Sequence, residues 1–193
     1  MINDEYVVFD LETTGLYPNS GDSIIEIGAV KLKNGEIIDR FDELIYPGRD
    51  ISDEITSITY ITNDMLKGKR TEKEVVCDFM KWVGDLPMVA HNARFDLSFL
   101  TKAYKLYNLG EISNIVIDTL GISRYLDSSE KYHNLAVLVK RYNIDWDENK
   151  HHRADYDSQG TALIFIKMLK RLELNNFKKI EDLTNYKFMV INK

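Results

Sequence analysis

Three short segments of the sequence carry acids and histidines at spacings that suit metal-dependent chemistry. In the first, Asp10 and Glu12 lie two residues apart at the end of the apolar run YVVFDL. Because side chains two apart on a strand point to one face, both carboxylates would project from the same side of a sheet. Burying them there is costly unless cations compensate their charge. The alternative is that the strand has already ended and both acids are solvated loop residues.

The second segment is VAHNARFD, residues 89–96, in which an apolar strand runs into a helix. Asp96 falls in the first turn of that helix. The helix dipole and the free N–H groups favour an acid at this position without any further function. His91 and Asn92 could likewise be turn formers, so this segment alone does not decide between a site and a helix start.

The third segment is HHRADYD, residues 151–157, which lies just before an apolar helix expected over 158–172. It contains His152 and Asp157. Taken by itself, it also fits a polar loop that ends in an aspartate capping the helix.

Together, the three segments place acids at the ends of core elements that one mixed sheet could bring together. Carboxylates are hard oxygen ligands that suit Mg²⁺ or Mn²⁺, whereas one cysteine, Cys77, and four histidines are poor material for zinc. Two such ions roughly 3.5–4 Å apart would clamp the attacking and leaving oxygens of a phosphoryl displacement. A neighbouring histidine, with an ordinary pKa near 6.5, would be a suitable base for the attacking water.

The elements that must position these residues follow from the hydrophobic pattern. Strands are expected at 6–11, 25–33 and 37–46, with a hairpin at Asn34-Gly35. Helices then alternate with strands: helices are expected at 71–83, 95–107, 119–125 and 135–142, and short strands at 87–90 and 115–117. This order predicts an α/β fold, a mixed five-stranded sheet of three antiparallel strands followed by parallel strands, flanked by helices.

The composition restricts the partners. The 193 residues include 25 Lys and Arg against 31 Asp and Glu, a net charge of −6, which argues against coating duplex DNA through a basic face. One cysteine excludes an internal disulfide and fits a reducing compartment. The N-terminus lacks a signal-peptide pattern and no stretch approaches a membrane span, so we expect a cytoplasmic protein.

The three segments resemble the exonuclease motifs of the DEDDh superfamily, the DnaQ-like 3′→5′ exonucleases. The resemblance rests on FDLETTG at 9–15, HNARFD at 91–96 and HRADYD at 152–157, in their order, spacing and HxAxxD form. It covers residues 1–174. The sequence is most similar to the proofreading exonuclease domain of PolC-type, C-family replicative DNA polymerases, through VVFDLETTGL, KLKNGEIIDRF, VIDTL and HHRADYDS. Residues 175–193 then form a polar tail that resembles the connection to the polymerase.

The resemblance implies an RNase H-like fold and a set of site residues. Two divalent cations, Mg²⁺ or Mn²⁺, would be bound by four carboxylates, with Asp10 touching both ions. Glu12 and Asp157 would hold the ion that activates water, and Asp96 would support the second ion through water. His152 would be the general base, because it has the family spacing to Asp157, whereas His151 would be an exposed neighbour.

The resemblance also implies contacts to the 3′-terminal nucleotide. These would come from the segment after the first motif and from the second motif: Thr13, Thr14, Gly15, Leu16, His91, Asn92 and Phe95. Asp118 and Asp155 lie near the motifs but outside their pattern, so we expect them to be structural or solvated.

The function expected from this resemblance is hydrolysis of the 3′-terminal phosphodiester of single-stranded or frayed DNA, releasing nucleoside 5′-monophosphates as proofreading beside a DNA polymerase. An enzyme of the same fold that trims RNA or degrades oligoribonucleotides is the alternative, since fold and motif do not fix the treatment of a 2′-hydroxyl. A non-catalytic module that docks a polymerase or clamp is the third hypothesis. It is disfavoured because no metal carboxylate is missing.

Overall fold

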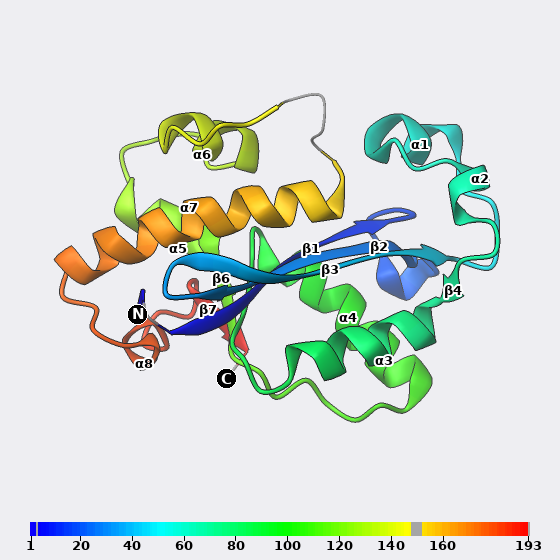
Figure 1. Ribbon diagram of the computed structural model, residues 1–193, viewed down its shortest axis with the longest axis horizontal. Helices are drawn as coiled ribbons and strands as arrows, with labels where there is room; N and C mark the ends of the chain where they lie inside the picture. The colour runs from blue at the N-terminus through cyan, green and yellow to red at the C-terminus, as the bar shows by residue number, and fades with distance from the viewer. Residues whose placement is uncertain (3, 148–151, 193) are drawn as a thin grey trace.

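A computed structural model describes residues 1–2, 4–147 and 152–192. Its centre is a mixed seven-stranded sheet with helices on both faces (Figure 1). The strand order is β4-β3-β2-β1-β5-β6-β7. The strands are β1 (Glu5–Thr13), β2 (Ile24–Lys33), β3 (Glu36–Tyr46), β4 (Arg70–Thr71), β5 (Met88–Ala90), β6 (Val116–Asp118) and β7 (Val190–Asn192).

The five expected strands are present in the expected directions. β1, β2 and β3 are antiparallel, and β5 and β6 run parallel to β1. The hairpin turn lies at Asn34 and Gly35, whose φ angles of 53° and 74° are those of a tight two-residue turn. The structure adds two short edge strands that the sequence pattern does not reveal: β4 has two residues, and β7 follows a polar segment.

Helices cover the two faces of the sheet separately. α3 (Glu72–Val83) and α4 (Ala93–Tyr107) lie on one face, while α5 (Thr119–Leu126), α6 (Leu135–Arg141) and α7 (Ala154–Leu174) lie on the other (Figure 1). α3 begins with the expected capping box between Thr71 and Glu74. The remaining short elements are η1 (Pro18–Ser20), α1 (Asp53–Thr59), α2 (Asn63–Leu66) and α8 (Ile180–Leu183).

The alternation of β1 decides which face receives the first pair of acids. Val7 and Phe9 pack into the core under α3 and α4, whereas Tyr6 and Val8 pack into the core under α7. Because the strand continues to Thr13, Asp10 and Glu12 keep the alternation of Val8 and project toward α7. They therefore lie on the strand, and the alternative of solvated loop residues is wrong.

β2 is buried almost along its whole length, including Glu26, which has no exposed surface. Its sequence, IEIGAVKLK, alternates and would fit a strand with one solvated face. The strand lies between β1 and β3, with α7 packed on one face and the core under α3 on the other. The tertiary arrangement thus overrides the alternation and buries an acid beside Glu12, its pairing partner on β1.

The segment after residue 174 packs on the same core as α7. Phe177, Leu183, Met189 and Val190 are buried in that cluster, and β7 pairs with β6. The backbone N–H of Asp118 donates to the carbonyl of Met189 at 2.7 Å. Residues 175–192 therefore complete the sheet at the β6 edge.

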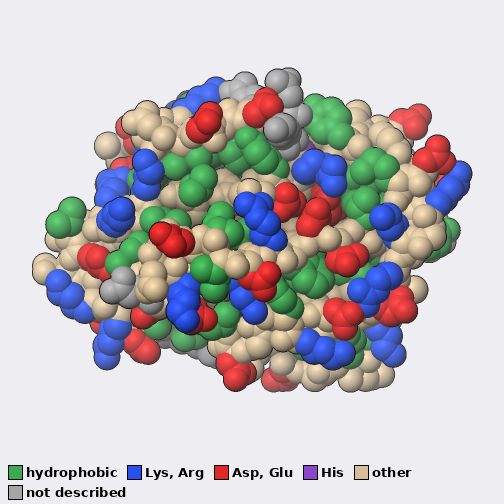
Figure 2. All heavy atoms as spheres, viewed as in Figure 1, with side chains coloured by type: hydrophobic (Ala, Val, Ile, Leu, Met, Phe, Trp, Pro, Cys, Tyr) green, Lys and Arg blue, Asp and Glu red, His purple; other side chains and the backbone are tan. Residues whose placement is uncertain are grey.

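The surface shows no large region of one charge on the face drawn in Figure 2, where basic and acidic side chains are interspersed. None of the helices in the described part of the chain is long and apolar enough to cross a membrane.

Gly28 on β2 allows the first turn of α7 to touch the sheet. It pairs with Asp10, and a Cβ at this position would overlap the backbone at Ala154 and Asp155. The close approach brings the start of α7 over the acids of β1. The absence of a side chain at residue 28 is thus a geometric condition for this contact.

We expect Gly28→Ala to lower the free energy of unfolding by about 2–3 kcal/mol, because the added methyl must push the start of α7 away from the sheet. Urea denaturation followed by circular dichroism measures this change. A change within about 0.5 kcal/mol, the range of a neutral surface substitution, would contradict the close contact.

Candidate active site

The expected acids and histidine line one pocket of about 630 Å³. β1, β5 and β6 are parallel, so their carboxyl ends meet at one edge of the sheet, where ligand sites of open α/β sheets lie. The pocket lies at this edge and at the start of α7. Eight of the sequence-predicted residues line it: Asp10, Glu12, His91, Asn92, Phe95, Asp96, His152 and Asp157.

Asp96 is bound to the strand that carries the first two acids. It lies in the first turn of α4 and is 2% exposed. Its Oδ1 accepts a hydrogen bond from the backbone N–H of Leu11, at 3.2 Å. This bond joins the second motif to β1 between Asp10 and Glu12.

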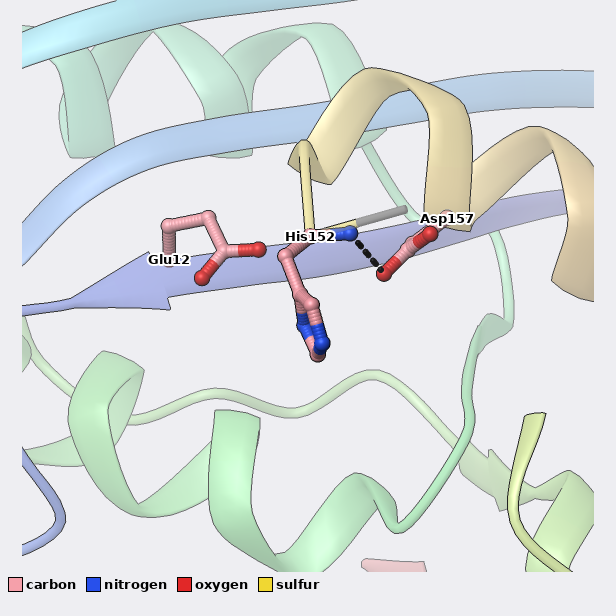
Figure 3. A group of neighbouring side chains, drawn as sticks. All are labelled: Glu12, His152 and Asp157. Atoms are coloured by element: carbon pink, nitrogen blue, oxygen red, sulfur yellow. Dashed lines mark hydrogen bonds between the residues drawn. The ribbon is translucent and has the colours of Figure 1, made fainter. Parts of the chain in front are cut away.

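His152 and Asp157 come from the start of α7. The helix begins at Ala154, earlier than the expected residue 158, so Asp157 lies inside its first turns and does not cap it. The backbone N–H of His152 donates to Asp157 Oδ2 at 3.2 Å, and residue 152 has a left-handed φ of 66° (Figure 3). His151 lies outside the described residues.

Glu12, His152 and Asp157 point into one space and form a group suited to a cation (Figure 3). One ligand atom from each of them lies within 4.8 Å of the others. Asp10 and Asp96 line the same pocket but are not part of this closest group.

Arg153, the residue directly before α7, is held by an ion pair that the sequence did not reveal. The Arg153 guanidinium donates to Glu26 through Nε at 3.0 Å and through Nη2 at 2.5 Å. Glu26 also accepts the backbone N–H of Ala154 at 2.8 Å. A buried acid with a bidentate arginine and a backbone donor has its charge compensated, and it holds the residue next to His152. The signal that could have revealed it is an acid inside the apolar run IIEIGAV.

The carboxylates of the site repel one another. Burial, followed by the charges of Asp96 and Asp157, raises the pKa of Asp10 well above its usual value. Burial and the charge of Asp157 raise the pKa of Glu12 to about 8, and burial raises the pKa of Asp96 to about 8.

This donor set fits a divalent cation. Carboxylate oxygens dominate it, and Mg²⁺ and Mn²⁺ prefer such ligands. A cation would also offset the repulsion that otherwise favours protonation of the acids. The chemistry of the pocket therefore fits the expected metal, and Asp10, Glu12, Asp96 and Asp157 are the residues that could hold it.

The second motif also brings neutral polar groups to the pocket. The His91 Nδ1 lies 3.0 Å from Thr119 Oγ1, and burial lowers the pKa of His91 to about 4, so this ring is neutral near pH 7. Asn92 has a left-handed φ of 63°, and its backbone N–H donates to the buried Asp118 at 3.0 Å. Asp118 thus shapes the turn after β5, in agreement with the structural role expected for it.

Four of the expected substrate-binding residues, Thr13, Thr14, Gly15 and Leu16, are not among those that line the pocket. Thr13 ends β1 and the other three begin the loop after it. Thr13 Oγ1 donates to the Gly15 carbonyl at 2.6 Å, and Leu16 is 67% exposed. The loop adjoins the pocket because it follows Glu12 directly.

The pocket also has a wall that the sequence did not predict. α5 and the segment that follows it contribute Leu120, Arg124, Lys131, Tyr132, His133 and Asn134. Residues 127–134 have neither a motif nor a hydrophobic period, so no sequence signal places them at the site.

Comparison with known proteins decides the family. The profile of the RNase T family, described as exonuclease, matches residues 7–165. The chain belongs to the RNase T exonuclease family. The expected exonuclease family is thereby confirmed.

This exonuclease chain is similar to one part of much longer proteins. It is 45% identical over 178 residues to "DNA polymerase III PolC-type" of Staphylococcus saprophyticus, which covers 92% of the chain and 12% of that relative. For the same protein of Staphylococcus epidermidis the identity is 46%, and the match covers 93% of the chain and 13% of the relative. The expected similarity to PolC-type polymerases is confirmed, and the chain spans only this small share of their length.

Solved exonuclease structures have the same fold. A complex described as exonuclease X with 5′ overhanging duplex DNA is 28% identical, with a TM-score of 0.69 over 86% of this chain and 92% of that chain. The nuclease domain of 3′hExo, described as a DEDDh family member bound to rAMP, is 23% identical, with a TM-score of 0.73 over 88% and 93% of the two chains. The expected RNase H-like α/β fold is confirmed.

The repulsion among the acids predicts that Asp10→Asn stabilises the metal-free exonuclease domain. The pKa of these carboxyls is higher in the folded protein than in the unfolded chain. As the pH rises from about 4 to 8, the unfolded chain has already lost these protons and the folded protein still has to lose them, so the free energy of unfolding falls. In EDTA at pH 8 we expect a gain of about 1–2 kcal/mol, or about 3–6 °C in melting temperature, which differential scanning calorimetry measures.

Asp155→Asn is the matched control, since Asp155 is an acid near the site, in the first turn of α7, but lies outside the pocket. We expect it to change the stability by less than about 0.5 kcal/mol. Mg²⁺ should stabilise the unsubstituted protein more than the Asp10→Asn variant. A variant that melts below the unsubstituted protein in EDTA at pH 8 would disprove the repulsion argument.

Proposed function

We propose that this exonuclease domain removes nucleotides from the 3′ end of single-stranded or frayed DNA in the 3′→5′ direction and releases nucleoside 5′-monophosphates. The observation that carries the proposal is the convergence of four acids and His152, from three separate motifs, on one pocket. Similarity to the PolC-type polymerases over 92% of the chain supports DNA as the substrate.

Asp10, Glu12, Asp96 and Asp157 hold two divalent cations, Mg²⁺ or Mn²⁺, in this proposal. When bound, the ions supply the positive charge that a phosphoryl displacement needs. Without them, the four acids would repel a phosphate. The oxygen-rich donor set and the raised pKa values of Asp10, Glu12 and Asp96 support this assignment.

His152 is the general base in the proposal. It accepts the proton of the attacking water while Asp157 holds its backbone in place. His91, Asn92 and Phe95, which line the pocket, contact the terminal nucleotide. Thr13, Thr14, Gly15 and Leu16 complete its binding from the adjoining loop.

The physiological role that we assign is proofreading for a DNA polymerase region, in the same chain or the same complex. The relatives named DNA polymerase III PolC-type are about eight times longer than the matched segment, which supports such a connection. Residues 1–174 carry the site and most of the exonuclease fold in this assignment, and residues 175–193, which add β7 to the sheet, lead toward the polymerase.

The activity is tested with a 5′-labelled single-stranded deoxyoligonucleotide in Mg²⁺, on which we expect a ladder of successively shorter products. Asp10→Ala should lower kcat by about 10³-fold or more, because it removes a central acid of the site. Asp155→Asn, an acid outside the pocket, should stay within about twofold of the unsubstituted enzyme. Activity retained by purified Asp10→Ala would refute the proposal.

The same assay distinguishes the RNA alternative. A matched oligoribonucleotide should be degraded more slowly than the deoxyoligonucleotide. Faster degradation of RNA would replace proofreading with RNA trimming as the function of this site.

His152→Ala should lower kcat by about 10²–10⁴-fold and leave metal binding intact, because a general base acts on the proton and not on the metal. Activity is measured by single-turnover cleavage, and metal binding by titration calorimetry with Mn²⁺. If His152→Ala, which removes the imidazole ring, also loses Mn²⁺ affinity, His152 is a metal ligand and its assignment as the general base is wrong.

A further inference from the structure

We propose that Arg124, Lys131 and Tyr132 form a separate subsite that holds the nucleotides preceding the 3′-terminal one. The subsite extends the proposed exonuclease function and rests on it, since it names the path of the strand that enters the same pocket. None of the three residues belongs to the exonuclease motifs.

The acids and the cations of the pocket come from different elements of the fold. Arg124 and Lys131 are the only permanently charged cations among the described residues that line it, and its acids come from β1, α4 and α7. Neither cation has a salt bridge within the described part of the chain. A strand carries a phosphate at every nucleotide, so the part beyond the scissile bond needs cations at the pocket wall.

The topology places these cations away from the loop proposed for the terminal nucleotide. That loop follows β1 and turns toward β2, where the Thr14 N–H donates to the Ser23 carbonyl at 2.9 Å. Arg124 lies on α5, after β6, two strands away on the opposite side of β1. A strand whose 3′ end reaches the acids can therefore leave toward α5.

Tyr132 offers an aromatic surface at this wall. Its side chain is 58% exposed, and the Lys131 ammonium lies 5.1 Å from its ring centroid. An exposed ring beside a cation is the combination with which proteins bind single strands without sequence preference, through a stacked base and a phosphate.

The segment that carries Lys131 and Tyr132 is held in place before any ligand binds. Arg141 donates to the Tyr132 carbonyl at 2.8 Å, and His133 Nδ1 lies 3.0 Å from Ser123 Oγ on α5. Arg171 pairs with Asp127 at 2.8 Å at the start of the segment. Such bonds lower the entropy lost when a ligand orders the wall, so the loop is built as a binding surface.

The test compares binding of a ten-nucleotide single strand with that of a dinucleotide. Both carry a 5′ fluorophore and a 3′-terminal phosphorothioate, and their Kd values are measured in Mg²⁺ by fluorescence anisotropy. We expect the intact protein to bind the longer strand more tightly. In the double variant Arg124→Ala/Lys131→Ala, the affinity advantage of the longer strand should fall by about tenfold. The slope of log Kd against log salt concentration should fall by about 1.4, which is about 0.7 for each of two lost phosphate contacts.

Tyr132→Ala should weaken binding of the longer strand by about tenfold. Tyr132→Phe should bind it as tightly as the unsubstituted protein, because the ring and not the hydroxyl stacks on a base. The charge-matched control is Lys73→Ala/Lys81→Ala on α3, on the other face of the sheet. An equal loss in this control would overturn the subsite, as would an unchanged length gain in the Arg124→Ala/Lys131→Ala variant.

The adjoining hollow provides a competing path. It shares Asn92, Leu120 and Arg124 with the pocket and contains Arg94. A larger effect of Arg94→Ala than of Lys131→Ala would overturn the proposed path. Because these readouts measure binding, absence of cleavage by the unsubstituted protein would contradict the proposed function and leave the subsite to be decided by the Kd values.

Discussion

The concentration of four carboxylates in one pocket is the constraint on which the rest of this structure depends. Water solvates such acids poorly at the edge of a packed sheet, so burial raises the pKa of Asp10 and raises those of Glu12 and Asp96 to about 8. Repulsion from neighbouring acids adds to the rise at Asp10 and Glu12. The surrounding fold must supply the free energy that this arrangement costs. The two apolar cores on either side of the sheet are that source.

Two features on β2 hold the acids together against their repulsion. Gly28 lets the backbone of α7 rest on the strand, and Glu26 binds Arg153 and the first amide of the helix. An acid thus anchors the basic residue beside His152 while adding negative charge near Glu12, whose pKa it helps to raise. Glu26, whose charge is compensated by Arg153, thus positions the start of α7. The gain in geometry outweighs the electrostatic cost of one more buried acid near the site.

The net charge of −6 is not spread evenly over the residues that line the pocket. The acids that line the pocket come from β1, α4 and α7, while Arg124 and Lys131 come from α5 and the segment that follows it. A nucleic acid that enters this pocket meets a short cationic wall and an acidic centre that is suited to metal ions. In the proposed function, such a surface holds a few nucleotides of a single strand and does not hold a duplex along a basic face.

The sequence by itself determined the five main strands, the capped helix α3 and the three motifs, because apolar periodicity and turn residues are local signals. It indicated that a mixed sheet could bring the motifs together. It did not determine that Glu26 is buried, that α7 starts early enough to contain Asp157, or that residues 131–134 line the pocket. The sequence also missed β4, since two residues carry no period, and β7, since it lies in a segment expected to be a polar tail. Those features depend on which distant segments pack together, and only the tertiary structure, through close contacts such as that at Gly28, decides this.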